Sequence, residues 1–324
     1  DPASKILSPF FPAGFREGNH EISFFPYCRR FERSNLHVLQ KNRTVGATLI
    51  FIRIMVLIGT VLLLLNVPLG MLNAADDKPG YTDTPVIPGQ KWKVHDAERP
   101  RPKVVAPNAV HLTSRSKDAK VLLETEKDLA NWRNGSADAK WKFVDDAMQE
   151  SPGTGDIFSR DEFGDMHLHL EFQTPSVVIG VSQGRGNSGV FLMGVYEVQI
   201  LDSFENPSYA DGQCGSIYGQ WPPLVNASRP PGDWQSYDII FYRPRWNSKG
   251  LVSPARVTVI HNGIVIHNNR EIMGPTRHRT TTSYKNHGGM DFIKGPIKLQ
   301  DHGNPLRFRN IWVRDLENGN DMGS

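Results

Sequence analysis

The chain has 324 residues, of which 39% are hydrophobic and 22% charged, and its formal net charge at pH 7 is +3. Residues 1–75 carry eight basic and four acidic side chains, so the rest of the chain is near −1. Residues 76–324 therefore have no excess of basic side chains, which argues against binding to nucleic acid. The two cysteines, Cys28 and Cys214, are too few for a disulfide framework or a cysteine metal cluster, so stability must come from core burial.

One strongly apolar run lies at residues 49–69, after Arg43 and before Ala74 and Ala75. A charged start, an apolar centre and small residues are typical of a secretory signal, so we expect cleavage near these alanines and an exported, periplasmic or extracellular protein. The alternative is a retained membrane anchor, because the run is about long enough to span a bilayer. In both cases residues 1–75 are a non-mature or anchoring segment outside the folded domain.

Residues 76–115 combine six prolines between positions 79 and 107 with many charges. This composition predicts a linker, either disordered or extended as an arm on the surface of a domain. The domain itself is expected over residues 116–318, where short alternating segments replace the proline-rich pattern.

The segments after residue 115 predict an all-β protein. Residues 166–172 alternate apolar and polar side chains, and Asn262-Gly263 between two apolar runs is a strong hairpin signal. The best helical signal, Asp118–Leu129, is one or two turns long. Many short strands with glycine- and proline-rich loops favour an antiparallel sandwich or jelly roll. The further predicted strands are 141–147, 189–192, 196–203, 235–243, 255–261, 263–268, 296–300 and 306–314.

The strand 196–203 carries the first candidate site. Glu197 and Gln199 lie two residues apart, so they share one face of the strand and offer a carboxylate beside an amide. This pair suits binding of, and proton transfer to or from, a hydroxyl-rich ligand such as a sugar. The alternative is that Glu197 is an ordinary solvent-exposed strand residue. A glycosidase of the laminarinase type would continue this face with a second carboxylate, but Leu201 stands there, which argues against a carboxylate pair.

A second candidate is Asp301-His302, at the end of an apolar strand, where a histidine beside a carboxylate can act as a general base. The alternative is a turn histidine whose aspartate caps backbone groups. In the long, glycine-rich loop 206–231, Gln213 and Tyr218 are candidate substrate contacts, since a tyrosine ring can stack on a sugar.

His167, His169 and Glu171 share one face of the strand 166–172 in a spacing that resembles metal ligands. Without a further ligand signature, an exposed polar strand face is the better interpretation. No spacing supports a calcium site either, so the sequence predicts no metal and no other cofactor.

Seven motifs in one order carry a family resemblance: NSGVF (187–191), YEVQILDS (196–203), GSIY (215–218), RPPGDWQ (229–235), PARVTV (254–259), LQDHG (299–303) and RFRNIW (307–312). Together they resemble the 3-keto-disaccharide hydrolase domain family over roughly residues 120–316. The resemblance implies a concanavalin-A-like jelly-roll β-sandwich in exported bacterial proteins. It also implies activity on glycosides that carry a ketone at C3 of the sugar.

A C3 ketone acidifies the proton at C2, so a single base can start elimination of the C1 substituent, after which water adds. We expect His302 or Glu197 as the base, with Asp301 beside it, and contacts to the enolate or to hydroxyls from Gln199, Arg185 and Asn187. The predicted function is therefore an exported hydrolase of 3-keto-glycosides, with an oligosaccharide or glycoside substrate. The alternative is a non-catalytic, lectin-like sandwich. A membrane partner follows only if the apolar run is retained.

Overall fold

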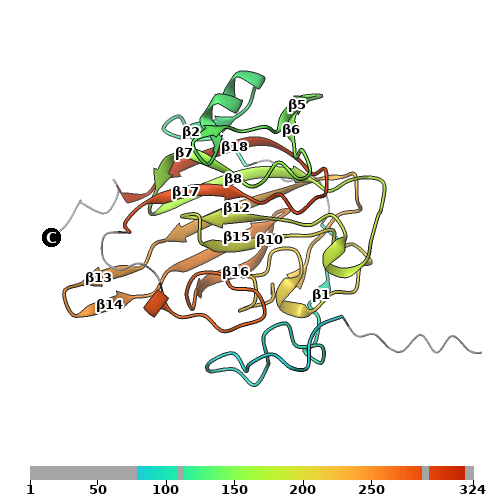
Figure 1. Cartoon of the computed structure of the whole chain (residues 1–324), viewed down its shortest axis with the longest axis vertical. Helices are drawn as coiled ribbons and strands as arrows, with labels where there is room; N and C mark the ends of the chain where they lie inside the picture. The colour runs from blue at the N-terminus through green and yellow to red at the C-terminus, as the bar shows by residue number, and fades with distance from the viewer. Residues whose placement is uncertain (1–78, 108–112, 287–291, 318–324) are drawn as a thin grey trace, which may run out of the picture. The chain divides into compact units, whose positions relative to one another are not determined.

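The computed structural model of the chain describes residues 79–107, 113–286 and 292–317, whose two large antiparallel β-sheets pack face to face (Figure 1). Two further sheets have two strands each, and one of them pairs β13 (Arg245–Asn247) with β14 (Gly250–Ser253). The strands of the larger, eight-stranded sheet are, in order, β16 (Ile264–Glu271), β15 (Arg256–His261), β12 (Trp234–Tyr242), β8 (Met166–Gln173), β18 (Arg307–Asp315), β6 (Ala147–Gln149) and β5 (Lys142–Val144), with β2 (Lys120–Leu123) also paired to β18. The smaller sheet has six strands, in the order β10 (Tyr196–Ile200), β9 (Ser188–Leu192), β17 (Gly295–Leu299), β7 (Ile157–Phe163), β3 (Trp132–Asn134) and β4 (Ala137–Asp138).

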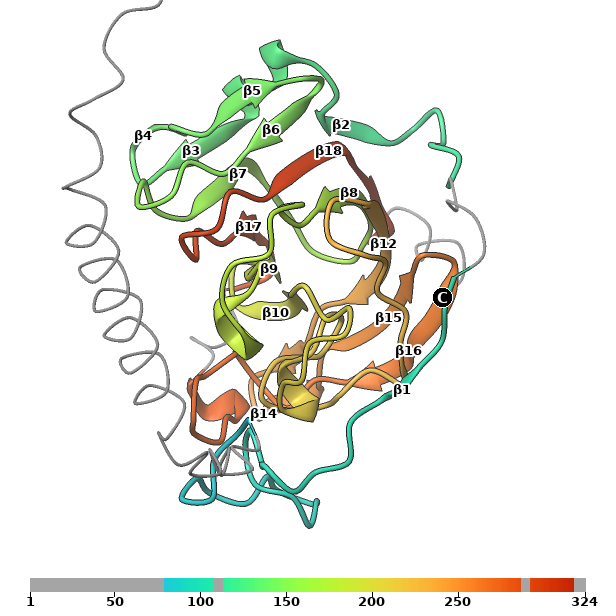
Figure 2. The ribbon, with the colours of Figure 1, turned by 90° about the vertical axis from the view of Figure 1, so that its right-hand side faces the viewer.

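The two sheets face each other across one hydrophobic core, and Figure 2 shows β9, β10 and β17 as a layer beside β8, β12 and β15. From the larger sheet the core takes alternate residues of β8 and β12, namely Met166, Leu168, Leu170, Phe172, Tyr237, Ile239 and Phe241. From β10 it takes Tyr196, Val198 and Ile200. Because neighbouring strand residues point to opposite faces, Glu197 and Gln199 lie on the outer face of the smaller sheet. The predicted all-β jelly-roll sandwich is confirmed.

Most predicted strands occur within one or two residues of their expected ends, and the hairpin turn at Asn262 and Gly263 has positive φ at both positions, 51° and 81°. The single strand predicted over 141–147 is wrong. It is a hairpin of β5 and β6, because Asp145 and Asp146 adopt positive φ and reverse the chain. The segment Asp118–Leu129, predicted to be helical, forms β2 and the start of the short 3-10 helix η1 (Glu126–Asn131).

Residues 79–99 of the arm fold back on themselves in turns, with bridges between Tyr81 and Asp96 and between Val86 and Lys93, and only residues 100–107 have the predicted extended form. The described part of the arm is therefore ordered. Its β1 (Lys103–Val104) pairs in parallel with β11 (Val225–Asn226). Ile87, Val94 and His95 are buried. No helix in the described ranges is long and apolar enough to cross a membrane, and the apolar run 49–69 lies outside those ranges.

The polar face of β8 is not exposed, which corrects the interpretation drawn from the sequence. His169 is fully buried, and His169 Nδ1 lies 2.9 Å from Asp238 Oδ1 of β12. Glu171 pairs with Arg309 at 2.6 Å and accepts from Asn310 at 2.9 Å, so each buried polar group has a partner on a neighbouring strand. In residues 79–107, 113–286 and 292–317, no group of three or more His, Cys, Asp or Glu is arranged to hold a metal ion.

Candidate active site

A cavity of about 430 Å³ lies on the outer face of the smaller sheet, over β9 and β10. Strand residues form its floor, and its walls come from surrounding loops, from η2 (Ser182–Gly184) and from the arm. The cavity is lined by Tyr81, Gln183, Asn187, Phe191, Glu197, Gln199, Tyr209, Tyr218, Thr276, His278, Gln300 and His302. Five of the eight predicted site residues are therefore brought together here, namely Asn187, Glu197, Gln199, Tyr218 and His302.

Glu197 lies on the cavity floor and is only 5% exposed. The position across the ladder from Gln199 is Gly189, and this glycine makes room for the glutamate: a Cβ there would lie 2.6 Å from Glu197 Oε1. Burial raises the pKa of the Glu197 carboxyl to about 8, against the opposing effect of the Lys298 ammonium. A carboxyl with this pKa changes its protonation state near neutral pH, as a proton-transfer catalyst must.

Amide side chains lie around Gln199, which shares the cavity floor with Glu197. The Gln199 amide donates to Gln183 Oε1 at 3.0 Å and lies 3.4 Å from Asn187 Oδ1. With the amide turned over, its nitrogen donates instead to the carbonyl oxygen of Ser188 at 2.8 Å and to Glu197 Oε1 at 3.1 Å. Amides offer both donors and acceptors, so this part of the floor matches a ligand rich in hydroxyl groups.

Two phenols and an imidazole form one wall. Tyr218 Oη lies 2.7 Å from Tyr209 Oη and 3.1 Å from His278 Nδ1. Burial raises the pKa of both phenols above their usual range, so they are neutral hydrogen-bond donors near pH 7. Partial burial, together with the nearby His95 and Arg279, lowers the pKa of His278. A neutral His278 can therefore accept a hydrogen bond from Tyr218.

His302 lies at the rim of the cavity and is exposed, whereas the neighbouring Asp301 does not line it. The Asp301 carboxylate accepts from the backbone N–H groups of Gly155 at 2.7 Å and Gly303 at 3.0 Å. Partial burial acts to raise the pKa of Asp301, but hydrogen bonds from Gly155 and Glu150 outweigh it, and the pKa is lowered. Asp301 thus shapes the loop that carries His302, as in the alternative interpretation of this motif, and it does not line the cavity.

Arg185 and Gln213, both predicted as substrate contacts, do not line this cavity. The Arg185 guanidinium donates to Asp202 Oδ2 at 2.6 Å and to the carbonyl oxygen of Phe204 at 3.0 Å, because the buried Asp202 carboxylate requires a cation. Arg185 lines a separate crevice of about 200 Å³. Gln213 lines a third crevice, beside Asn226.

Several residues that line the cavity were not predicted as site residues: Tyr81, Gln183, Phe191, Tyr209, Thr276, His278 and Gln300. Gln300 and Phe191 stand within motifs already noted, and Tyr209 lies in the long loop singled out as a site loop, so local signals for these existed. Tyr81 and His278 belong to segments with no local signal, because their place depends on contacts between residues far apart in the chain.

The cavity, with its tyrosine wall and one buried carboxylate on the face of a β-sandwich, is the candidate ligand-binding site of this chain. A model of the 3-keto-alpha-glucoside-1,2-lyase-like domain matches residues 118–314. This match covers more than half of the chain, and the chain belongs to this family, the 3-keto-disaccharide hydrolase family predicted from its motifs.

Two relatives support this assignment. A 3-keto-disaccharide hydrolase from Bacteroides thetaiotaomicron is 22% identical over 258 residues, covering 62% of this chain and 79% of the relative. A crystal structure of a candidate glycosyl hydrolase from Parabacteroides distasonis is 42% identical, with a TM-score of 0.59, and covers 67% of this chain and 93% of that one. The chain is thus a carbohydrate-active enzyme of the 3-keto-disaccharide hydrolase family.

Proposed function

We propose that this enzyme cleaves 3-keto-glycosides, with Glu197 as the base that removes the proton at C2 of the oxidised sugar. One observation carries the proposal: Glu197 is the single carboxylate among the described residues that line the cavity, and burial raises its pKa to about 8. Hydrolysis by two carboxylates needs a second acid in the same cavity. Elimination next to a ketone needs one base, and this cavity supplies it.

The reaction begins when the ionised Glu197 takes the C2 proton, which is acidic because the electron pair it leaves behind is delocalised into the C3 carbonyl. The resulting enolate expels the C1 substituent and forms a C1–C2 double bond. Glu197, now protonated, can return its proton to the departing oxygen. Addition of water across the double bond then restores the C2 proton and places a hydroxyl at C1, so the net change is hydrolysis.

The enolate oxygen needs a hydrogen-bond donor, and Tyr218, whose raised pKa keeps its phenol protonated, offers one. With Tyr209 donating to the Tyr218 oxygen at 2.7 Å, the Tyr218 proton is free to point to His278 or to a substrate oxygen in the cavity. A preorganised donor aimed at developing charge supplies about 10²–10³-fold in rate. The amides of Gln199 and Asn187 remain for the sugar hydroxyl groups.

The test compares a chromogenic 3-keto-glucoside with its unoxidised parent, in the wild-type enzyme and in Glu197→Gln and His302→Ala. We expect cleavage of the keto compound alone, a loss of about 10²–10⁴-fold in Glu197→Gln, and a smaller loss in His302→Ala, whose exposed side chain lies at the rim. A larger loss in His302→Ala would make that residue the base. Sugar binding without cleavage of either compound would favour the lectin-like alternative.

We also propose that the domain acts outside the cytoplasm. The support is the apolar run 49–69 followed by Ala74 and Ala75, a pattern typical of a cleaved secretory signal. Cell fractionation and N-terminal sequencing of the recovered protein test this proposal. A mature chain beginning near residue 75 is expected, and a membrane fraction that keeps the run would show the anchor instead.

A further inference from the structure

The arm over residues 79–99 builds part of the cavity wall, although it lies outside residues 118–314, where the family model matches. Tyr81 of the arm is one of the lining residues, and it is half-buried. Its ring centroid lies 6.0 Å from that of Tyr209 and 6.2 Å from that of His278, the latter in an edge-on arrangement. The arm therefore meets the same wall that carries the proposed enolate contact.

Buried contacts fix the arm in this place. The Tyr81 N–H donates to the carbonyl oxygen of His95 at 2.8 Å, and the His95 N–H donates to Asp211 Oδ2 at 3.0 Å. Both His95 and Asp211 are fully buried. The His95 ring lies against the rings of Tyr209 and Tyr218, with centroids 4.3 Å and 4.7 Å apart. The backbone of the arm is thus bonded to the loop that supplies the two cavity phenols.

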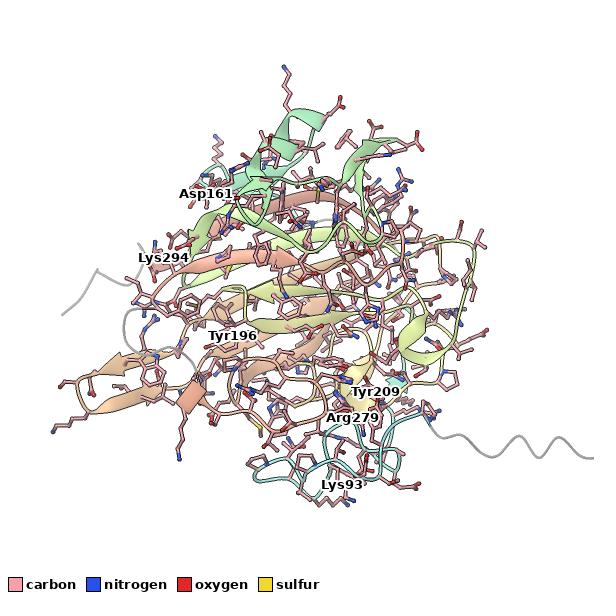
Figure 3. All side chains as sticks on the ribbon, viewed as in Figure 1. Lys93, Asp161, Tyr196, Tyr209, Arg279 and Lys294 are labelled. Carbon is pink, nitrogen blue, oxygen red and sulfur yellow. The ribbon has the colours of Figure 1, made fainter. Side chains whose placement is uncertain are left out.

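A second clamp holds the Tyr81 side chain. The Arg279 guanidinium lies over the Tyr81 ring, 4.0 Å from its centroid, and its Nη2 donates to both carboxylate oxygens of Asp83 at 3.0 Å. A cation over one ring face leaves the other face and the edges for further contacts. Figure 3 shows Arg279 and Tyr209 at the end of the sandwich reached by the arm, where Lys93 is labelled.

We propose that Tyr81 is a specificity-determining residue that contacts the second sugar of a disaccharide substrate, the part attached to C1 of the oxidised ring. This inference rests on the proposed function, since it takes the oxidised ring to lie over Glu197 on the cavity floor. A volume of about 430 Å³ is in the range of sites that hold drug-sized ligands, so the cavity extends beyond the reacting ring. An aromatic side chain on the wall suits the apolar face of a sugar.

The first test measures kcat and KM for a 3-keto-disaccharide and for methyl 3-keto-glucoside, which lacks the second ring. Tyr81→Ala should raise KM roughly five- to tenfold for the disaccharide and leave the methyl glycoside within about twofold, because one aromatic contact is lost. Tyr81→Phe keeps the ring and should stay close to wild type. The matched control is Tyr242→Ala, which removes an exposed tyrosine that does not line the cavity.

Calorimetric binding of the unoxidised disaccharide and methyl glucoside separates this inference from the proposed chemistry. If the wild-type enzyme turns over neither keto compound, the proposed function fails, yet weaker disaccharide binding in Tyr81→Ala alone would still support a sugar contact at Tyr81. Equal changes for both ligands, or no change for either, would overturn the inference even when keto-glycoside cleavage is observed. Thermal unfolding of the variants confirms that the arm remains packed.

Discussion

Glu197→Gln should remove two kinds of pH dependence at once, because in the proposed mechanism the same ionisation affects both catalysis and stability. With a pKa of about 8, Glu197 is about one-tenth ionised at pH 7. If the ionised form is the base, kcat/KM of the wild-type enzyme should rise about tenfold per pH unit up to about pH 8 and then level off. Glutamine cannot ionise, so any residual activity of the variant should lack this rise.

The effect on stability follows from the same shift. Burial raises the Glu197 pKa from 4.5 to about 8, which at 1.36 kcal/mol per unit is about 5 kcal/mol. Because the folded-state pKa lies above the unfolded one, this contribution to the free energy of unfolding is fully present below about pH 4.5, where Glu197 is protonated in both states. It is lost as the pH rises to about 8, because the unfolded chain then releases its proton more readily than the folded one. Glu197→Gln does not incur this loss, so it should gain in free energy of unfolding relative to wild type as the pH rises.

Both effects can be measured on the same preparations, with kcat/KM taken from pH-jump assays and unfolding free energies from urea titrations between about pH 5 and 9. Glu162→Gln is a suitable control, since Glu162 is an exposed glutamate on β7 of the same sheet. A kcat/KM profile that is flat from pH 6 to 9 would refute the role of Glu197 as base. A stability difference between wild type and variant that does not change with pH would refute the shifted ionisation itself.

Three further predictions concern single residues in the cavity floor, in its wall and under the loop that carries His302. Gly189→Ala should lower kcat by up to about 100-fold with little change in Tm, because its methyl group would lie 2.6 Å from Glu197 Oε1 and displace the carboxylate; an unchanged kcat would contradict this. Tyr218→Phe should lower kcat by about 10²–10³-fold at similar KM, and a rise in KM alone would assign Tyr218 to substrate binding. Glu150→Gln should reduce the loss of unfolding free energy between pH 7 and 10, since burial and Asp301 raise the Glu150 pKa to about 9 and ionisation above neutral pH costs stability; urea titrations that show equal losses would refute it.

The fold was largely predictable because its signals are local. The alternation over residues 166–172 depends only on the period of a strand, and the Asn262-Gly263 turn depends on the backbone freedom of two residues. The same logic explains the error over 141–147. Asp145 and Asp146 both adopt positive φ, and two consecutive aspartates are a weaker turn signal than asparagine followed by glycine.

The site was predictable only where strand geometry determines it. Glu197 and Gln199 share a face because they are two residues apart, and this places both on the cavity floor without knowledge of the rest of the fold. Arg185 is close in sequence to cavity residues, but its guanidinium pairs with the buried Asp202 carboxylate and does not line the cavity. No local pattern could supply Tyr81, since Asp83 and Arg279 of its clamp are 196 residues apart.

Substitutions in the cavity floor and substitutions at Tyr81 should have different effects on the enzyme. The floor combines the proposed base and amide side chains on two paired strands, and Gly189 must stay small for Glu197 to fit, so changes there are expected to act on the reaction itself. The wall at Tyr81 is held by backbone hydrogen bonds and by a surface ion pair, neither of which touches Glu197. If Tyr81 contacts the second sugar as proposed, substitutions of this side chain should alter which second sugar is accepted while the proposed base on the floor is unchanged.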